Sequence, residues 1–484
     1  MFKLEAEAEF GYQEVGEMAL QSINPATEEV LATFEEFSSN QLDRALERAE
    51  QAFYGWRRVS FAERSRLMRG AAGHLREQVA RLAGLISAEM GKPIVEAEAE
   101  IEKCAWNCDF YADNAGRFLA PQSTPSNAAE SYVAFEPLGP VLAIMPWNFP
   151  FWQVVRFAAP ALMAGNTALL KHASNVSQCA LAIEETFLAA GFPAGVFQTL
   201  LASGQQTEAL IDDPRIRAVT LTGSDSTGSR VGAASGRALK KSVLELGGSD
   251  PFIVLADADI AAAAETGVRA RNQNTGQSCI AAKRFIVVES VADEFEQRFS
   301  DGVAHLKIGD PMQRETQIGP LARGDLRDSL EEQVRRSVDE GAHLALGGHR
   351  MEGRGYFYAP TVLTRVTPVM TAAREETFGP LAAVMRARDT DEAITIANQT
   401  PFGLGASLWT RDVDRARSLA KDVRAGSVFI NGMVASDPRL PFGGIKRSGY
   451  GRELSEFGIR EFVNIQTVWI GPAAGQGQAS ASVE

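Results

Sequence analysis

Two side chains of this chain have the chemistry of a nucleophile and a general base. Cys279 ends the stretch NTGQSC (residues 274–279), and Glu245 begins the stretch ELGG (residues 245–248). A cysteine thiolate attacks electron-poor carbon, and a carboxylate on another loop can remove the proton that such chemistry releases. Either residue alone also has a structural explanation. Free cysteines are commonly small buried hydrophobic residues, and a Glu before two glycines commonly ends a strand.

Two further polar residues follow apolar runs that predict buried strands. Asn148 lies between two prolines in MPWNFP (residues 145–150), after the run 141–145. It is either the centre of a rigid turn or a hydrogen-bond donor to a developing oxyanion. Lys171 ends the run 167–171, at the strand end where α/β proteins usually bind ligands. A solvated lysine explains that position equally well.

A glycine turn follows the predicted strand 218–222. Gly223 and Gly228 frame it, and such a turn lets backbone N–H groups approach a phosphate at the start of a helix. The spacing differs from the usual dinucleotide-binding fingerprint, so a plain turn remains an alternative. That fingerprint also expects an acidic residue about 20 residues later, which binds ribose. Glu245 fits that position, so a standard Rossmann interpretation makes it a cofactor ligand and not a base.

The composition predicts an ordinary multidomain globular protein. The 484 residues are 45% hydrophobic and 23% charged, which suggests two or three domains. The net charge is −13 and no long basic run occurs, so nucleic-acid binding is not expected. No apolar run reaches the roughly 20 residues of a membrane helix, and the acidic N-terminus does not resemble a targeting segment. We expect no membrane association.

The cysteines and histidines predict neither a disulfide framework nor a metal site. Four cysteines are too few for a framework in so long a chain, and the five histidines form no ligand pattern. Cys104 and Cys108 share a helix face, but no further ligands lie near them in the sequence. A reducing, cytoplasmic compartment fits this cysteine usage.

The periodicity of apolar residues predicts an α/β fold with two sheets in series, divided near Gly247. Helices are expected first, at 40–53 with Asn40 as N-cap, at 61–91 and at 94–118, followed by a loop at 121–129 and an exposed strand at 132–136. Alternating strands and helices then predict parallel βαβ units. The expected strands are 141–145, 167–171, 196–200, 218–222, 252–255 and 284–288; the expected helices are 151–163, 177–190, 205–211, 226–239, 260–271, 291–305, 326–340 and 390–398.

Taken in order, these motifs resemble the aldehyde dehydrogenase superfamily from Ile23 to Thr467. Within it, the stretches around Lys171 and Cys279 look most like the shorter, bacterial-type succinate-semialdehyde dehydrogenases. Each motif alone is weak, but the ordered set is specific. The set is Pro146 to Pro150, Lys171 with Ser174, Thr222 to Ser224, Glu245 to Gly248, Gly276 to Cys279, Glu376 to Pro380 and Pro441 to Gly444.

The resemblance implies a domain layout beyond what periodicity gives. A cofactor-binding domain is expected over 21–120 and 138–246, and a catalytic domain with parallel-rich sheet over 247–454. A small β oligomerisation arm, formed by 121–137 and 455–470, would pair with the catalytic sheet of a neighbour in a homodimer or homotetramer. Residues 1–20 are expected to be an irregular lead-in, and residues 471–484 a disordered tail.

The resemblance also implies roles for the residues above. Cys279 would attack the aldehyde, Asn148 would stabilise the oxyanion, and Glu245 would activate the hydrolytic water. Hydride would pass to a nicotinamide cofactor. The residues implied in cofactor binding are Met145, Pro146, Trp147, Lys171, Ser174, Gly223, Ser224, Leu246, Glu376 and Phe378.

Ser174 is a departure that bears on the choice of cofactor. NAD-preferring members of the superfamily often carry Glu at this position, where it binds the ribose 2′-hydroxyl. A Glu would repel a 2′-phosphate, whereas Ser can donate to one and Lys171 adds positive charge. We therefore expect NADP to be preferred over NAD.

The substrate implied by the resemblance is succinate semialdehyde. Arg156 stands where such members place an arginine for the distal carboxylate, although a surface helix arginine is the alternative. A second arginine of some relatives would fall at Gln273 and is missing here, and the Ser436 hydroxyl would compensate for it. Trp152 and Phe442 would line the tunnel.

Two other activities stay open at this stage. One is a broad-specificity aldehyde dehydrogenase that acts on medium-chain or aromatic aldehydes. The other is a cysteine hydrolase without cofactor. Such a hydrolase needs a histidine partner, and no histidine lies near Cys279 in the sequence.

Overall fold

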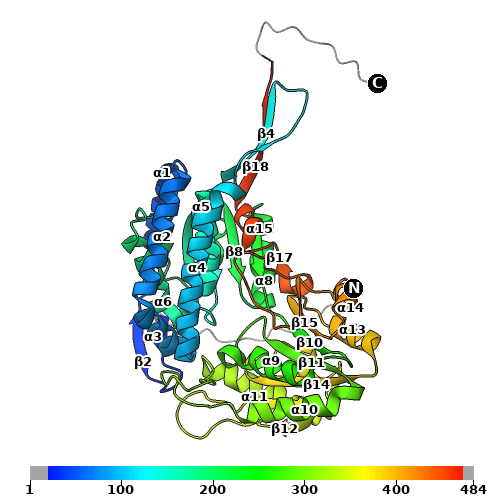
Figure 1. Cartoon of the computed structure of the whole chain (residues 1–484). Helices are drawn as coiled ribbons and strands as arrows, with labels where there is room; N and C mark the ends of the chain where they lie inside the picture. The colour runs from blue at the N-terminus through cyan, green and yellow to red at the C-terminus, as the bar shows by residue number, and fades with distance from the viewer. Residues whose placement is uncertain (1–19, 473–484) are drawn as a thin grey trace, which may run out of the picture.

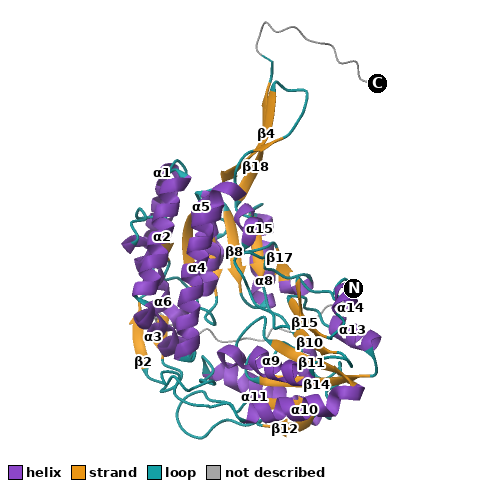
Figure 2. Ribbon diagram, viewed as in Figure 1, coloured by secondary structure: helices purple, strands orange, loops and turns teal. Residues whose placement is uncertain are grey.

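The computed structural model describes residues 20–472, which form two sheets with their helices and a narrow projecting arm (Figure 1). The predicted lead-in and tail lie outside the described residues, apart from Leu20, Gly471 and Pro472. Leu20 begins the hairpin of β1 (Leu20–Ile23) and β2 (Val30–Phe34). Figure 2 shows helices on both sides of the sheets, which is the predicted α/β class.

The first sheet has six strands in the order β17-β9-β8-β5-β6-β7. All neighbours run parallel except β17, which pairs antiparallel with β9. Successive residues of β5 face opposite cores: Val141 and Ala143 belong to one cluster and Leu142 to another. This two-sided burial explains the continuous apolar runs. The bounds are β5 Pro140–Met145, β6 Thr167–His172, β7 Phe197–Thr199, β8 Ala218–Thr222, β9 Lys241–Glu245 and β17 Gly449–Tyr450.

The helices around this sheet correct two predictions. The N-cap of the first helix is Ser38 and not Asn40, because the Ser38 and Gln41 side chains form a capping box. The region 61–91 is two helices, which meet at Gln78 because its backbone leaves the helical conformation. The bounds are α1 Ser39–Trp56, α2 Phe61–Glu77, α3 Val79–Met90, α4 Ile94–Phe118, α5 Trp152–Ala164, α6 Ser177–Ala189, α7 Gly204–Leu210 and α8 Asp225–Arg237.

The second sheet has seven strands in the order β12-β13-β14-β11-β10-β15-β16, and only β12 is antiparallel. The sequence predicted only β10 and β11 among them. The strands are β10 Asp250–Val254, β11 Ala282–Val288, β12 His343–Leu346, β13 Thr361–Thr364, β14 Leu381–Ala387, β15 Gly405–Trp409 and β16 Ser427–Ile430. The helices of this part are α9 Ile260–Asn272, α10 Glu289–Ala304, α11 Gly324–Asp339, α12 Thr371–Arg374, α13 Thr390–Asn398 and α14 Val413–Leu419, and the later helix α15 (Ser455–Arg460) lies by the first sheet.

The arm is a three-stranded antiparallel sheet that projects from the body (Figure 1). Strand β18 (Val463–Ile470) pairs along its length with β4 (Glu130–Pro137), and β3 (Gln122–Ser123) covers the other edge of β4. Helix α15, just before β18, packs against α4 and α5 in the body. No helix within residues 20–472 is long and apolar enough to cross a membrane.

The segment after β9 and the loop before β11 lie close together, since a Cβ on Gly248 would be 2.6 Å from the Cys279 carbonyl oxygen. Glu245 is the last residue of β9, where it pairs with Thr222 of β8 and with Gly449 of β17. The segment 273–281 connects α9 to β11 of the second sheet and carries Cys279. The fold therefore brings two motifs from different sheets to one region.

Candidate active site

Cys279 is held by a loop with an unusual backbone. Asn274 and Thr275 both have φ of 55°, and Gly276 has φ of 72°. Arg271, buried at the end of α9, donates to the carbonyl oxygens of Gly276 at 2.6 Å and Gly379 at 2.7 Å. Such backbone conformations persist only when surrounding contacts impose them, and they concentrate at functional sites.

Asn148 is buried and its amide is oriented by its neighbours. Gln153 Nε2 donates to Asn148 Oδ1 at 3.1 Å, so Asn148 Nδ2 faces the cysteine loop and donates to the Gln277 carbonyl at 3.0 Å. Asn274 Nδ2 donates to the Asn148 carbonyl at 2.8 Å. An amide nitrogen carries two hydrogens, so one Nδ2 hydrogen remains for a substrate oxygen.

Lys283 connects three parts of the site. Its buried ammonium donates to the carbonyls of Gly248 at 2.6 Å and Cys279 at 2.9 Å, and to Glu376 Oε1 at 2.9 Å. The Gly248 N–H also donates to Glu376 Oε1, at 3.0 Å. The Cys279 loop and Glu376 are therefore fixed by one cation.

Burial raises the pKa of the Cys279 thiol to about 12, against the opposing effect of the charges on Lys283 and Arg156. The side chain nevertheless remains partly accessible to solvent. The thiol is thus the resting form in this arrangement at neutral pH. Attack on carbon needs a group that removes its proton.

The Glu245 carboxylate is buried, with a relative exposure of 2%, and neither oxygen has a hydrogen-bond partner among the described residues. Its pKa is raised well above the usual range by burial and by the nearby charge of Glu453, while Arg156 and Arg452 act in the opposite direction. A Cβ at Gly443 would lie 2.6 Å from Glu245 Oε1, so the carboxylate points toward that glycine. Glu245 does not line either cavity that reaches Cys279.

A groove of about 480 Å³ runs from the first sheet to Cys279. Ser174 is exposed and lies one position beyond Ala173, the last residue of this segment that lines the groove. Trp147 and Phe378 pack edge to face in its wall, with ring centroids 5.6 Å apart. The other nine residues expected to bind a cofactor line it: Met145, Pro146, Trp147, Lys171, Gly223, Ser224, Leu246, Glu376 and Phe378.

One end of this groove suits an anionic ligand. Gly223 and Ser224 line it at the start of α8, where Ser224 is the N-cap. Lys171 lines it from the end of β6; burial lowers the pKa of Lys171, and the charge of Glu36 acts in the opposite direction.

Another part of the groove is formed by Glu376. Gly247 lies against this side chain, since a Cβ on Gly247 would be 2.3 Å from Glu376 Oε2.

A second cavity, of about 170 Å³, reaches Cys279 from α4 and α5. We call it the inner cavity. Cys279 and Gln153 line both the inner cavity and the groove, so the thiol lies where the two meet. The four residues expected to bind substrate all line the inner cavity: Arg156, Trp152, Ser436 and Phe442.

Arg156 lines the inner cavity, but its charge is already paired. Its guanidinium forms a buried ion pair with Glu453 and lies over the Phe442 ring, 4.6 Å from the centroid. Lys103 of α4 lines the same cavity. Its ammonium donates to Ser436 Oγ at 2.8 Å and lies 4.3 Å from the centroid of the Trp152 ring.

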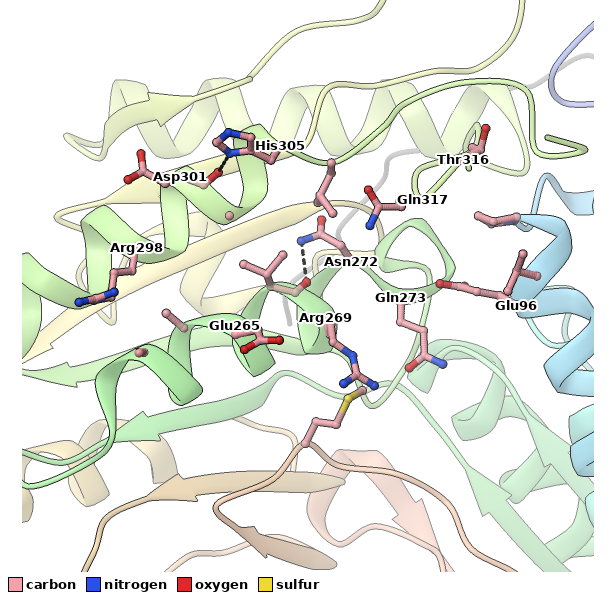
Figure 3. A pocket seen from close by; sticks show the side chains of 18 of the residues that line it. Glu96, Glu265, Arg269, Asn272, Gln273, Arg298, Asp301, His305, Thr316 and Gln317 are labelled. Atoms are coloured by element: carbon pink, nitrogen blue, oxygen red, sulfur yellow. Dashed lines mark hydrogen bonds between the residues drawn. The ribbon is translucent and has the colours of Figure 1, made fainter. Parts of the chain in front are cut away.

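A third and larger hollow, of about 950 Å³, adjoins the inner cavity at Glu96 and Gln273. Figure 3 shows Glu96 projecting from one side and Arg269 and Gln273 from the other. The Glu96 carboxylate accepts a hydrogen bond from the Asn274 N–H at 2.6 Å, and burial raises its pKa to about 7. This hollow is a vestibule outside the inner cavity.

Sequence reasoning missed four charged residues of the site: Lys103, Arg323, Glu453, and Lys283 as an anchor of the cysteine loop. Arg323 lines the groove, with its guanidinium 5.9 Å from the centroid of the Trp147 ring. A lysine near the start of a fully buried strand was the one local signal for Lys283. No local pattern indicated a role for Lys103 or Glu453, because the residues that they contact are distant in sequence.

Within residues 20–472, no three His, Cys, Asp or Glu side chains gather as a metal site. Cys104, Cys108 and Cys179 are fully buried, and burial raises the pKa of each thiol. These three cysteines belong to the core around α4 and α6.

The comparisons with known proteins all point to the same family. The model of the aldehyde dehydrogenase family matches residues 12–468. A protein of Synechocystis sp. named probable succinate-semialdehyde dehydrogenase (NADP+) is 52% identical over 94% of this chain and 100% of its own length. One of Mycobacterium tuberculosis, named succinate-semialdehyde dehydrogenase (NADP+) 1, is 50% identical over the same shares.

A solved structure matches over the same extent. The succinic semialdehyde dehydrogenase of Streptococcus pyogenes, in complex with NADP+ as the cofactor, superimposes with a TM-score of 0.92. It is 37% identical and covers 94% of this chain and 100% of its own. The likeness therefore includes both sheets, the arm and the region between them.

Proposed function

Since the chain belongs to the aldehyde dehydrogenase family, we propose that it oxidises succinate semialdehyde to succinate with NADP as the preferred cofactor. One observation carries the proposal: Cys279 lies where a groove fitted for a nucleotide meets a small cavity that contains cations. The names of the relatives agree with this substrate and cofactor.

Cys279 is the nucleophile in this proposal. Its thiol first releases its proton to solvent. The sulfur then adds to the aldehyde carbon, a C–S bond forms, and the C=O π bond opens to give the oxyanion of a thiohemiacetal. The free Asn148 Nδ2 hydrogen and the Cys279 N–H donate to that oxygen. When bound in the groove, NADP supplies the two-electron oxidant that accepts the hydride. Loss of the hydride from the thiohemiacetal carbon leaves a thioester on Cys279, and the sulfur is a good leaving group for the hydrolysis that follows.

Glu245 is the general base for hydrolysis of that thioester. Burial without a hydrogen-bond partner raises the pKa of Glu245, so its carboxylate, once it has lost its own proton, is a stronger base toward water than an exposed Glu. From its position toward Gly443 the side chain must turn to reach the thioester. Water then adds to the acyl carbon, the C–S bond breaks, and succinate and the Cys279 thiol are released.

The groove supports a dinucleotide at the start of α8, and NADP over NAD at Lys171 and Ser174. The N-terminus of α8, with Gly223 and Ser224, suits the pyrophosphate. Ser174 places no carboxylate beside the adenosine ribose, and the Lys171 ammonium adds the charge that a 2′-phosphate requires. Glu376, fixed by Lys283, would hold the nicotinamide ribose, with Phe378 and Trp147 beside the ring.

The inner cavity supports a short acidic aldehyde over the alternatives. Its volume is about 170 Å³, and cationic side chains line it beside Trp152 and Phe442. A broad-specificity enzyme for medium-chain or aromatic aldehydes would not need these cations. A cysteine hydrolase is not supported, since no histidine lines either cavity among the described residues.

Steady-state kinetics on paired substrates and cofactors tests the proposal. Initial rates are measured with succinate semialdehyde and butanal, each with NADP and with NAD at equal concentration. We expect the highest kcat/KM with succinate semialdehyde and NADP. A clear preference for butanal or longer aldehydes would support the broad-specificity alternative, and a preference for NAD would reject the cofactor assignment.

We also propose that the protein is a cytoplasmic homodimer or homotetramer. The arm leaves β18 with one edge free of any described strand, and β16 likewise ends the seven-stranded sheet. Addition of β18 to β16 of a neighbouring copy would pair both edges. Cysteine usage supports a reducing compartment, since all four cysteines are unpaired.

A further inference from the structure

Two of the four charges that line the inner cavity belong to buried ion pairs with residues outside it. Its charged residues are Glu96, Glu100, Lys103 and Arg156. Arg156 is paired with Glu453, and Glu100 is paired with Lys92 in a second buried ion pair. Among the described residues, no carboxylate forms an ion pair with Lys103. Its ammonium donates to the Ser436 hydroxyl and lies over the face of the Trp152 ring.

The fourth charged residue, Glu96, already has a hydrogen-bond donor outside the Lys103 region. Its carboxylate accepts the Asn274 N–H, and with a pKa of about 7 it is partly protonated at neutral pH. The Glu100 carboxylate is likewise occupied, because it accepts the backbone N–H groups of Phe151 and Trp152. Lys103 is therefore the cation in this cavity whose charge has no partner.

We propose that the Lys103 ammonium and the Ser436 hydroxyl bind the carboxylate of the substrate, while Arg156 serves to hold Glu453. The inference rests on the proposed function, because it needs an aldehyde that carries a carboxylate. It replaces the sequence-based assignment of the carboxylate to Arg156. A carboxylate that took the Arg156 guanidinium would leave Glu453 buried without a partner, which is costly.

The geometry around Lys103 suits this role. The ammonium donates three hydrogen bonds in all, of which one goes to Ser436. Ser436 accepts that bond, so its own hydrogen is free to donate to a second carboxylate oxygen. The Trp152 ring lies beneath the ammonium and keeps it from water on that side. Two donors from α4 and the loop before Asp437 therefore converge on one point.

The test compares two aldehydes of equal carbon number, succinate semialdehyde and butanal, at saturating NADP. Lys103→Met is expected to raise KM for succinate semialdehyde about 30-fold, the size of a lost charged hydrogen bond, and to leave kcat and the KM for butanal within about twofold. Lys103→Arg is expected to recover most of the loss. Lys421→Met, the same change at an exposed lysine, is expected to change neither KM.

A double variant separates Lys103 from Arg156. Arg156→Met with Glu453→Gln removes the buried pair without leaving one charge behind. We expect it to lower kcat for both aldehydes and to keep the preference for succinate semialdehyde. Loss of that preference in the double variant, together with its retention in Lys103→Met, would assign the carboxylate to Arg156 and overturn the inference.

The wild-type enzyme distinguishes failure of the inference from failure of the proposed function. If the wild type does not prefer succinate semialdehyde to butanal, the proposed function is rejected and the inference falls with it. If the wild type has the preference and Lys103→Met retains it, only the inference is rejected. Should Lys103→Met fail to fold, Ser436→Ala is expected to raise KM for succinate semialdehyde alone, about threefold to tenfold.

Discussion

Burial sets the pKa of Glu245, the residue proposed as general base. Its carboxylate has no hydrogen-bond donor in the resting arrangement, and the charge of Glu453 adds to the burial that raises its pKa. Such a group costs stability in the folded protein, and that cost is understandable if the group must accept a proton during turnover.

Glu245→Gln should therefore separate the two halves of the reaction. The variant is expected to release NADPH in a rapid burst close to the number of active sites, and then to turn over about 10²- to 10⁴-fold more slowly, since thioester hydrolysis lacks its base. Stopped-flow absorbance of NADPH measures both phases. Loss of the burst as well would show that Glu245 also deprotonates Cys279, and an unchanged kcat would reject it as the base.

Burial, and after it the charge of Arg156, lower the pKa of Lys103 to about 8. Glu100, Cys104 and Asp437 also face it and act in the opposite direction. Below pH 8 the ammonium is charged and binds a carboxylate; above pH 8 it loses its proton. The ratio of KM for succinate semialdehyde to KM for butanal should then rise, about tenfold per pH unit once well above pH 8.

Two controls belong to this pH profile. Cofactor binding and Cys279 ionisation act on both aldehydes, so the ratio cancels them. Lys103→Arg should give a ratio that stays flat with pH, because a guanidinium does not deprotonate in this range. A wild-type ratio that is flat from pH 7 to pH 10 would contradict the assignment of Lys103.

At the scale of elements, the cysteine loop depends on a close approach between two backbones. A Cβ on Gly276 would lie 2.4 Å from the Gly379 carbonyl oxygen, and the φ of 72° disfavours any other residue. Gly276→Ala should cost about 1–3 kcal/mol of stability and most of the activity, as Cys279 is displaced. Thermal melts and kcat measure the two effects.

Gly73→Ala is the matched control for this loop. Gly73 lies inside α2 with open space around its Cα, so the added methyl should be neutral or stabilise by about 0.5–1 kcal/mol, with kcat unchanged. If Gly276→Ala behaved like this control, the loop would tolerate the movement and the close approach would not position Cys279.

The elements also show what sequence can and cannot predict. The helix 94–118 and the strand 218–222 have the predicted bounds, because the helix is long and the strand is a run of small, apolar and β-branched residues buried throughout. Strands β13, β15 and β16 were missed, since each is short and separated from its neighbours by irregular segments. The placement of Lys103 beside Ser436 was not predictable, because no local pattern links residues that meet only through the tertiary fold.

At the scale of the whole molecule, the proposed oligomer depends on the projecting arm. Strand β18 carries large apolar side chains in the open, with Ile465 at 63% and Trp469 at 53% relative exposure. An exposed apolar edge strand is a liability unless another chain covers it. The arm therefore supports an assembly in which β18 extends the sheet of a second copy at β16.

Charges on β18 should prevent that assembly. Ile465→Glu with Trp469→Glu is expected to shift the protein from dimer or tetramer to monomer in light scattering coupled to size exclusion, because two carboxylates would be buried without partners at the interface. Leu239→Glu is the control: Leu239 is 94% exposed and follows α8 on the body, so its replacement should leave the oligomer intact. An unchanged mass for the double variant would place the contact elsewhere, and a wild-type monomer would leave the arm without the partner proposed for it.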